Sequence, residues 1–414
     1  MATLSKDLDH DIKPLNLLAF PKNEQPICEL TGVKAVVNLI TPSCTMFFAS
    51  HELAEQAWHG IIKKISHLLG PLQQQPPIVG TSEERSRRIN NVNRSKLSLI
   101  EFCLSESSKL LSVKKYQLAI PAAIQALKFT KEIDGDHAIS MVEPYLHLAQ
   151  ASLGIKQFHK SEEYLSLAQW IVLNKEDCPA RLKSKLHMLI GRTKTSLGQF
   201  EEAKAEFSKS VLFSSKAHGP DSAITSMGYF RLGDVFLAQT KVECALAYFD
   251  KVVDIWFKYL SALHNSLDPA HRGGLGLNMR ETARIRAGFP KDDRGQTIEN
   301  PDKGHANPAV NAQGLGIGTE YELNEEDLAD GRANLEDILE HRRRLLGSTH
   351  IATGEVEFTI GLYEYFLLTN IPSAEIFLQN AKAVYEVQLG EEHNSTKHVV
   401  TVLELISQQK QFAI

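Results

Sequence analysis

The chain has 414 residues with a formal net charge of −5, and 43% of them are hydrophobic. This composition is typical of a protein that buries a sizeable core, and the small negative charge gives no bulk attraction to nucleic acid or to an acidic membrane. No apolar run approaches the roughly 20 residues of a membrane span. The five cysteines are scattered and odd in number, which disfavours a disulfide framework. Secreted, membrane-spanning and disulfide-stapled classes are therefore not expected.

Residues 1–80 combine short apolar runs with many prolines, so long helices are not expected there. Cys28, Cys44, the pair Phe47-Phe48 and Trp58 follow one another in an outline that resembles a MYND-type zinc finger. A closed zinc site needs four ligands, and only two cysteines remain in this segment. We therefore predict a degenerate MYND-like module over residues 1–80, without metal.

Apolar packing is expected to hold this module together in place of zinc. The candidate core residues are Val36, Val37, Leu39, Ile40, Phe47, Phe48, Trp58, Ile61, Ile62 and Ile65. An alternative is a residual metal site that uses Cys28, Cys44, His51 and His59. The segment from His51 to Glu55 also half-resembles the metalloprotease motif, but Glu55 stands where the second histidine would hold zinc.

Residues 81–265 contain a pattern that repeats every 42 residues. Its anchors are Tyr116, Phe158, Phe200 and Val242, and a fifth copy starts at Ile371. Three, seven and ten residues after each anchor comes a small or apolar residue, and these offsets lie on one face of a helix. The positions are Ala119, Ala123 and Ala126; Ser161, Leu165 and Ala168; Ala203, Phe207 and Ser210; Ala245, Phe249 and Val252; and Ala374, Leu378 and Ala381.

A second helical pattern precedes each anchor, with small residues such as Ala149, Gly191 and Gly233 nine residues before it. Small residues there let two helices approach closely. Glycine-containing turns such as Gly135-Asp136-His137 separate the copies. The pattern resembles the tetratricopeptide repeat, so we predict an all-α solenoid in which each helix pair packs against its neighbours.

Residues 266–323 interrupt the repeats. The stretch 271–318 holds nine of the chain's 25 glycines and few large apolar groups, so we predict a flexible insertion. Helical periodicity resumes in residues 324–414, where Leu335–Leu346 fits the second helix of a further repeat. The expected organisation is the module over residues 1–80, repeats over 81–265, the insertion over 266–323 and C-terminal repeats over 324–414.

Partner binding is expected on the inner face of the repeats, which the first helix of each pair lines in tetratricopeptide proteins. A mixture of methionine and aromatic side chains with single charges suits an apolar helix or an extended protein segment. The alternative for each residue is that it packs inside the stack. The candidates are Glu143, Leu146, Lys185, Met188, Arg192, Met227, Phe230, Asp234, Tyr363 and Phe366.

Catalytic and cofactor motifs are not found in the sequence. The glycine-rich run Gly314–Gly318 is not preceded by a predicted strand, so a tether is the better interpretation than a dinucleotide loop. Histidines 137, 218, 350 and 393 fall in the turns between repeats, where turn geometry accounts for them. We predict no enzyme activity, no cofactor, and no catalytic or metal-binding residue.

A module of this kind followed by tetratricopeptide repeats, together with several specific strings, resembles the family of zinc finger MYND domain-containing protein 12. The likeness covers about residues 15–265 well and about 324–410 loosely. The strings are Ser82-Glu83-Glu84-Arg85, Leu99-Ile100-Glu101-Phe102-Cys103, Ile120-Pro121-Ala122-Ala123, the run from Glu162 to Trp170, Gly228-Tyr229-Phe230 and Ile255-Trp256.

The resemblance implies a scaffold subunit of an inner dynein arm in the axoneme of cilia and flagella. The implied partners are an inner-arm dynein heavy chain, a subunit related to tetratricopeptide repeat protein 29 and the axonemal microtubule complex, with neither nucleic acid nor membrane. The alternative is a cytoplasmic co-chaperone or dynein preassembly factor. A methyltransferase is disfavoured because no SET sequence accompanies the module.

Overall fold

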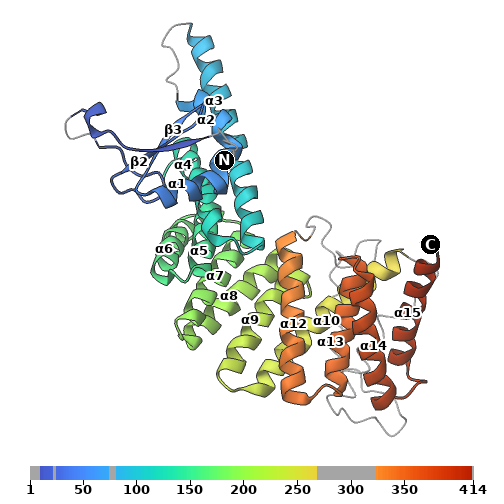
Figure 1. The fold of residues 1–414 in the computed structure, drawn as a ribbon. Coiled ribbons are helices and arrows are strands. Elements are labelled where there is room, and N and C mark those ends of the chain that lie inside the picture. The colour runs from blue at the N-terminus through green and yellow to red at the C-terminus, as the bar shows by residue number, and fades with distance from the viewer. Residues whose placement is uncertain (1–9, 22–24, 74–80, 268–322, 324, 413–414) are drawn as a thin grey trace, which may run out of the picture. The chain divides into compact units, whose positions relative to one another are not determined.

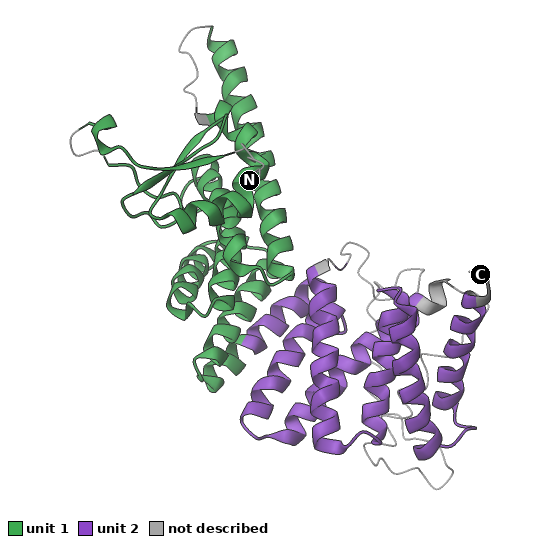
Figure 2. Cartoon of the chain, viewed as in Figure 1, with its two compact units in different colours: residues 1–206 green, residues 207–414 purple. Residues whose placement is uncertain are grey.

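The computed structural model describes residues 10–21, 25–73, 81–267, 323 and 325–412. The predicted insertion, residues 266–323, lies almost entirely outside these ranges. The chain divides into two compact units, residues 1–206 and 207–414 (Figure 2).

Unit 1 begins with a small antiparallel sheet, which the sequence analysis did not predict. Its strands are β1 (Asp11–Pro14), β2 (Val37–Ile40) and β3 (Thr45–Phe48), in the order β1-β2-β3. Val37 pairs with Phe48 and Ile40 with Thr45, so β2 and β3 form a hairpin. The residues of β2 and β3 are mostly β-branched, aromatic or long apolar types, which favour a half-buried strand.

Three helical segments follow the sheet without a break. They are α1 (His51–Ala57), a π-helical turn (Trp58–Ile62) and α2 (Lys63–Gln73). Leu39, Phe48, Trp58 and Ile61 are buried, as expected for an apolar module core, whereas Val36 is 59% exposed, contrary to the prediction. Successive side chains of an extended segment point to opposite faces, so Val36 lies on the face opposite to Ala35 and Leu39, both of which are buried.

The module core is continuous with the first helix pair. Leu99 and Cys103 of α3 (Ser82–Ser112) and Ala122, Ala126 and Phe129 of α4 (Tyr116–Asp134) belong to the same buried cluster as the module residues. The module therefore folds against the repeats of unit 1 rather than as an isolated finger.

The remaining described helices form the repeats (Figure 1). In unit 1 they are α3 (Ser82–Ser112), α4 (Tyr116–Asp134), α5 (Val142–Gly154), α6 (Phe158–Asn174) and α7 (Ala180–Ser196). The boundary between the units falls within α8 (Phe200–His218). Unit 2 continues with α9 (Ala223–Ala238), α10 (Val242–Leu267), α12 (Glu325–Leu346), α13 (Ile351–Phe366), α14 (Ile371–Gln388) and α15 (Asn394–Phe412).

The repeat register is confirmed at every predicted copy. Helices α4, α6, α8, α10 and α14 each begin at their anchor residue. All fifteen positions three, seven and ten residues after the anchors are buried, none more than 3% exposed. The close approach expected at the small residues is also present: a Cβ on Gly233 would lie 2.6 Å from the ring of Phe249. The all-α helical-repeat class follows from this register.

The turn inside each helix pair has one recurring conformation. The residue two positions before each anchor adopts a left-handed backbone, with φ of 59° at Lys114, 62° at Lys156, 76° at Gly198, 61° at Thr240 and 50° at Thr369. The backbone N–H of the following residue donates to a carbonyl in the last turn of the preceding helix. Lys241, for example, donates to the Phe236 carbonyl at 2.9 Å. This geometry satisfies carbonyls that a helix end leaves open.

The turns between pairs also repeat their hydrogen bonds. Gly219, Gly347 and Gly390 have positive φ, and the threonine six residues after each donates to its carbonyl at 2.8–2.9 Å. His350 and His393 accept the N–H two residues later through Nδ1, which caps α13 and α15. The prediction that turn geometry accounts for these two histidines is confirmed.

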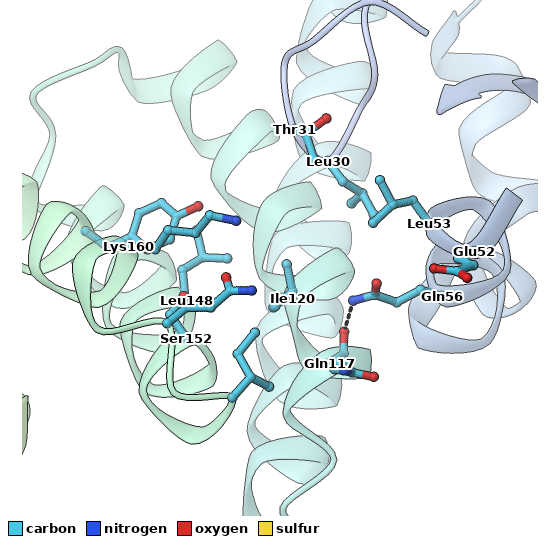
Figure 3. Close-up of a pocket in the computed structure, with 13 residues that line it drawn as sticks. Leu30, Thr31, Glu52, Leu53, Gln56, Gln117, Ile120, Leu148, Ser152 and Lys160 are labelled. Atoms are coloured by element: carbon cyan, nitrogen blue, oxygen red, sulfur yellow. Dashed lines mark hydrogen bonds between the residues drawn. The ribbon is translucent and has the colours of Figure 1, made fainter. Parts of the chain in front are cut away.

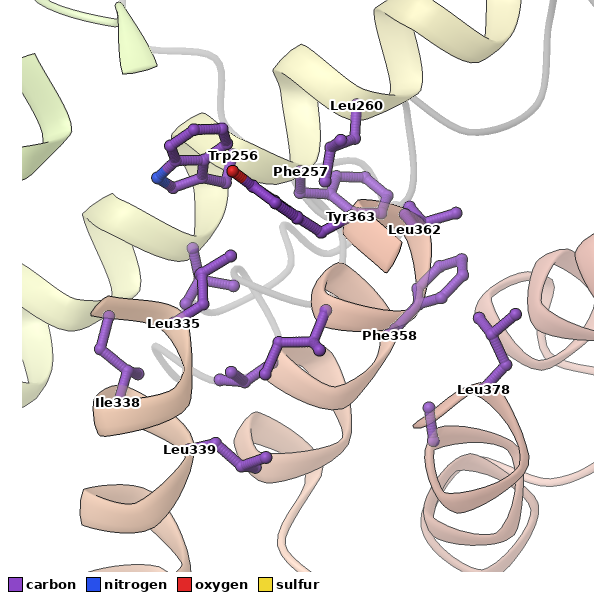
Figure 4. Packing of buried hydrophobic residues seen from close by; sticks show 14 of the residues in the cluster. Trp256, Phe257, Leu260, Leu335, Ile338, Leu339, Phe358, Leu362, Tyr363 and Leu378 are labelled. Atoms are coloured by element: carbon purple, nitrogen blue, oxygen red, sulfur yellow. The ribbon is translucent and has the colours of Figure 1, made fainter. Parts of the chain in front are cut away.

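Unit 2 has a large aromatic core around Trp256 and Tyr363, whose ring centroids are 5.2 Å apart (Figure 4). Helix α12 contributes Leu335, Ile338 and Leu339 to this core. Helix α12 contacts α9 and α13, which are the first helices of the pairs on either side of it. Among the described helices, none is long and apolar enough to cross a lipid bilayer.

Candidate functional site

A pocket of about 430 Å³ opens in unit 1 between the module and the first repeats (Figure 3). We call it the module–repeat pocket. The module supplies Leu30, Thr31, Glu52, Leu53 and Gln56, and helices α4 to α6 with the turn between α5 and α6 supply Gln117, Ile120, Leu148, Ser152, Ile155, Gln157, Lys160 and Tyr164. Neither part of the unit forms this pocket alone.

The module side of the pocket is positioned by the start of α1. The Ser50 hydroxyl accepts the Leu53 N–H at 3.2 Å and so fixes where this helix begins. Helix spacing then places Glu52 and Gln56 on one side of α1. The amide of Gln56 donates to the Gln117 carbonyl on α4, which ties the two walls together (Figure 3).

A close backbone approach seats the module on α4. Gly60 lies in the π-helical turn, and a Cβ there would lie only 2.6 Å from the Leu118 carbonyl oxygen and 3.2 Å from Pro121. Glycine allows this contact because it carries no side chain. The module can therefore pack closely on α4 at this residue.

The pocket lining offers both apolar and polar contacts to a bound segment. Leu30, Leu53, Ile120 and Ile155 provide apolar surface, while amides, hydroxyls and two opposite charges provide polar contacts. The charges come from opposite walls, Glu52 from the module and Lys160 from α6.

Cys28 and Cys44 both lie buried in the module core. The Cys44 sulfur lies 3.2 Å from the Thr41 hydroxyl, and burial raises the pKa of the Cys44 thiol. Neutral thiols of this kind behave as small apolar side chains. Within the described residues, no group of three or more histidine, cysteine, aspartate or glutamate side chains is placed to hold a metal ion.

The inner-face candidates of unit 1 divide into two groups. Leu146 is 3% exposed and packs in the core of α5 to α7, so its prediction as a partner-binding residue is wrong. Lys185, Met188 and Arg192 are partly exposed and lie on one face of α7. Beneath them, burial and the charge of Lys185 lower the pKa of His147 to about 4.

In unit 2, α12 lies between α9 and α13, and this placement changes the predicted groove. Phe230 and Tyr363 are fully buried, so their prediction as exposed groove residues is wrong. The Tyr363 hydroxyl donates to the Leu328 carbonyl of α12 at 2.6 Å. Met227 and Phe366 remain partly exposed. The chain's own helix therefore covers part of the surface that was predicted for a partner.

Asp234 also faces α12. Its carboxylate accepts from Arg231 at 3.2 Å and lies 3.9 Å from the His341 ring. Burial raises the pKa of Asp234 to about 6, which Arg231 opposes and the nearby charge of Asp337 reinforces. Asp234 is thus a structural group in the contact between α9 and α12.

The residues of the module–repeat pocket were not predicted from the sequence. Their positions depend on the contact between α1 and α4, and no motif marks a contact between segments so far apart. The only local signal was Ser50 before His51-Glu52, a typical helix start.

Comparison with known proteins supports the repeat fold. Residues 184–216 match the tetratricopeptide repeat family model. Among solved structures, BtubC (BKLC) from P. vanneervenii is similar, with 12% identity, a TM-score of 0.31, and coverage of 70% of this chain and 92% of that one. Aspartyl phosphate phosphatase F from Bacillus subtilis shows 14% identity, a TM-score of 0.35, and coverage of 82% and 86%. The repeat match at residues 184–216 and the recurring helix register together support a tetratricopeptide-type helical-repeat fold, which suggests a role in protein interaction.

Proposed function

We propose that this chain is a non-enzymatic scaffold subunit of an axonemal inner dynein arm in cilia or flagella. It binds the tail of an inner-arm dynein heavy chain, or a companion subunit related to tetratricopeptide repeat protein 29. The family resemblance described above suggests these partners. The seating of a degenerate MYND-like module on tetratricopeptide-type helices supports the proposal, because the resemblance implies this combination.

The observation that carries the binding role is the module–repeat pocket. Its two walls come from different parts of unit 1, and it presents apolar side chains between the charges of Glu52 and Lys160. A partner segment with one or two apolar side chains between a basic and an acidic residue matches this lining. The face of α7 with Lys185, Met188 and Arg192 offers a second contact for the same partner.

Extraction of flagella expressing the tagged chain tests the cellular role. An inner-arm subunit stays with detergent-washed axonemes and is released by high salt together with an inner-arm dynein heavy chain. A preassembly factor is instead lost with the cytosol at the detergent step. Flagella that lack the chain should lose one inner-arm density in tomograms while outer arms persist, and intact inner arms would contradict the proposal.

A matched pair of variants tests the pocket. Thr31→Arg with Lys160→Glu alters two exposed residues of the lining, so we expect normal folding and reduced recovery of the dynein subunits. Thr45→Arg with Lys175→Glu makes the same chemical changes at exposed positions outside the lining and should leave recovery unchanged. Equal recovery with both variants would exclude this pocket as the partner site.

A further inference from the structure

The N-terminal half of α3 extends beyond the helices that cover its C-terminal half (Figure 1). Lys96 pairs with Glu132 near the end of α4 at 2.6 Å, whereas residues 82–91 are all exposed. The residues before Lys96 represent roughly 20 Å of helix at 1.5 Å per residue. We call residues 82–95 the projecting segment.

The buried stripe of α3 continues into the projecting segment. Cys103 and Leu99 pack in the module core, and the same spacing of three and four residues leads back through Lys96 and Val92 to Ile89. Such a spacing keeps these residues on one face of the helix. Ile89 is nevertheless 57% exposed. The helix face that packs in the module core through Leu99 and Cys103 thus continues to Val92 and Ile89, which lie beyond that core.

Basic charge surrounds this stripe. From Arg85 to Lys96 the sequence contains four arginines, one lysine and no acidic residue. Arg85 lies in line with Ile89, and Arg88 flanks it, while Arg87 and Arg94 fall on the opposite face by the same helix periodicity. The acidic residues of the segment, Glu83 and Glu84, lie at its start, where Glu84 closes the capping box. The charge beside Ile89 and Val92 is therefore basic and complementary to an acidic helix.

The local sequence does not favour a helix by itself. Thr81 and Glu84 form a capping box that starts α3. The next three turns, however, contain three asparagines, two serines and a valine, all poor helix formers, and their positive charges oppose the helix dipole near an N-terminus. In most proteins, packing of an apolar face supplies the stability that such a segment lacks.

We propose that the projecting segment docks an acidic amphipathic helix of another protein. The apolar side chains of that helix cover Ile89 and Val92, and its carboxylates face Arg85 and Arg88. This surface is separate from the module–repeat pocket and does not depend on the dynein assignment.

The probe is a labelled 21-residue peptide with leucine at the two core positions of each heptad and glutamate elsewhere, titrated into the full chain. We expect binding that weakens with salt and slows hydrogen exchange in residues 82–96. The same peptide with alanine in place of leucine should bind at least tenfold more weakly. Equal affinity for the two peptides would overturn the proposal.

Two charge-matched double variants test which face of α3 binds the peptide. Arg85→Glu with Arg88→Glu should weaken binding at least tenfold, and Arg87→Glu with Arg94→Glu should weaken it by much less, because both remove the same charge from the same helix. Equal losses would overturn the proposal, since they indicate attraction without a docking face. Preferential binding of a DNA duplex over the peptide, or a dimer of the chain that Ile89→Asp dissociates, would also overturn it.

Discussion

The two units use the same repeat spacing but fill the space between their helices with different chemistry. In unit 1, small and hydroxyl side chains join neighbouring helices: Ser161 donates to the Ala149 carbonyl at 3.1 Å and lies 3.2 Å from the Thr193 hydroxyl. In unit 2, Ser214 and Thr225 make a similar hydroxyl contact between α8 and α9, but arginines join the helices around α12. The buried Arg342 pairs with Asp250 of α10, and the partly buried Arg332 pairs with Glu364 of α13. Both arginines come from α12.

This difference follows from the extra helix. Small residues suffice where adjacent helices pack closely, as in unit 1. Where α12 enters between α9 and α13, charged residues become buried and must be paired, because an unpaired buried charge is costly. The repeat spacing therefore sets where the helices lie. The inserted helix α12 determines which charged side chains become buried and must form ion pairs.

Removal of Arg342 should have the largest effect. Its side chain is fully buried, donates to the Ala352 carbonyl at 2.5 Å and pairs with Asp250. Asp250 is itself 37% exposed, so water can solvate its carboxylate once the arginine is removed, and the loss is that of charged hydrogen bonds, about 1.5–3 kcal/mol. Arg342→Ala should lower the free energy of unfolding of unit 2 by that amount in urea titrations. Arg344→Ala, at an exposed position of the same helix, should change the free energy of unfolding little.

By contrast, Ser161→Ala in unit 1 should lower the free energy of unfolding by about 1 kcal/mol. Equal losses at Arg342 and Ser161 would remove the distinction between the units.

The seating of the module provides the next test. Gly60→Ala brings a methyl group against the Leu118 carbonyl, and overpacking of this kind costs about 1–3 kcal/mol. Hydrogen exchange should accelerate in residues 51–62 and leave unit 2 unchanged. His59→Ala, at the exposed neighbouring position, is the control. Unaltered exchange in Gly60→Ala would show that the module does not depend on this close approach.

The parts of the fold that local chemistry specifies were predictable from the sequence. Each anchor begins a helix because the preceding turn adopts one recurring left-handed conformation, and the small residues three positions later fit only a close helix contact. Those features occur within a few residues of one another, so one chain suffices to detect them.

The parts that depend on distant segments were not predictable. The sequence pattern of α9 and α13 marks Phe230 and Tyr363 as inner-face residues, but it contains no sign that α12 will cover them. The same holds for the module–repeat pocket, since Gln56 and Gln117 meet only after the module has packed on α4. The predicted inner face of α7 is still untested as a partner surface.

Acid should affect the contributions of one buried group in each unit in opposite directions. His147 in unit 1 has a folded pKa near 4, below its ordinary 6.5, so the unfolded chain takes up the proton first and stability falls as the pH drops below 6.5. Asp234 in unit 2 has a folded pKa near 6, above its ordinary 3.8, so the folded chain takes up the proton first and stability rises as the pH drops through 6.

Substitutions that remove each titration measure these contributions. At one pH unit below the higher of its folded and unfolded pKa values, each group changes the free energy of unfolding by about 1.4 kcal/mol. His147→Gln should therefore cancel a loss of that size near pH 5.5, and Asp234→Asn should cancel a gain of that size near pH 5. Urea unfolding of each variant and its parent across pH 4–7 gives the difference directly. If acid changed the stability difference between variant and parent in the same direction for both variants, the pKa shift described for His147 or for Asp234 would be wrong.

The smallest effect is expected at the turns inside the helix pairs, where the units should behave alike. Lys156 in unit 1 and Thr240 in unit 2 both hold left-handed backbones, with φ of 62° and 61°. A side chain in that conformation costs about 1 kcal/mol relative to glycine, so Lys156→Gly and Thr240→Gly should each raise the free energy of unfolding by up to that amount. Glu163→Gly, in the interior of α6, should lower it by about 1 kcal/mol, because glycine weakens a helix. A loss of stability at either turn would mean that its left-handed conformation is not what allows the helix pair to close.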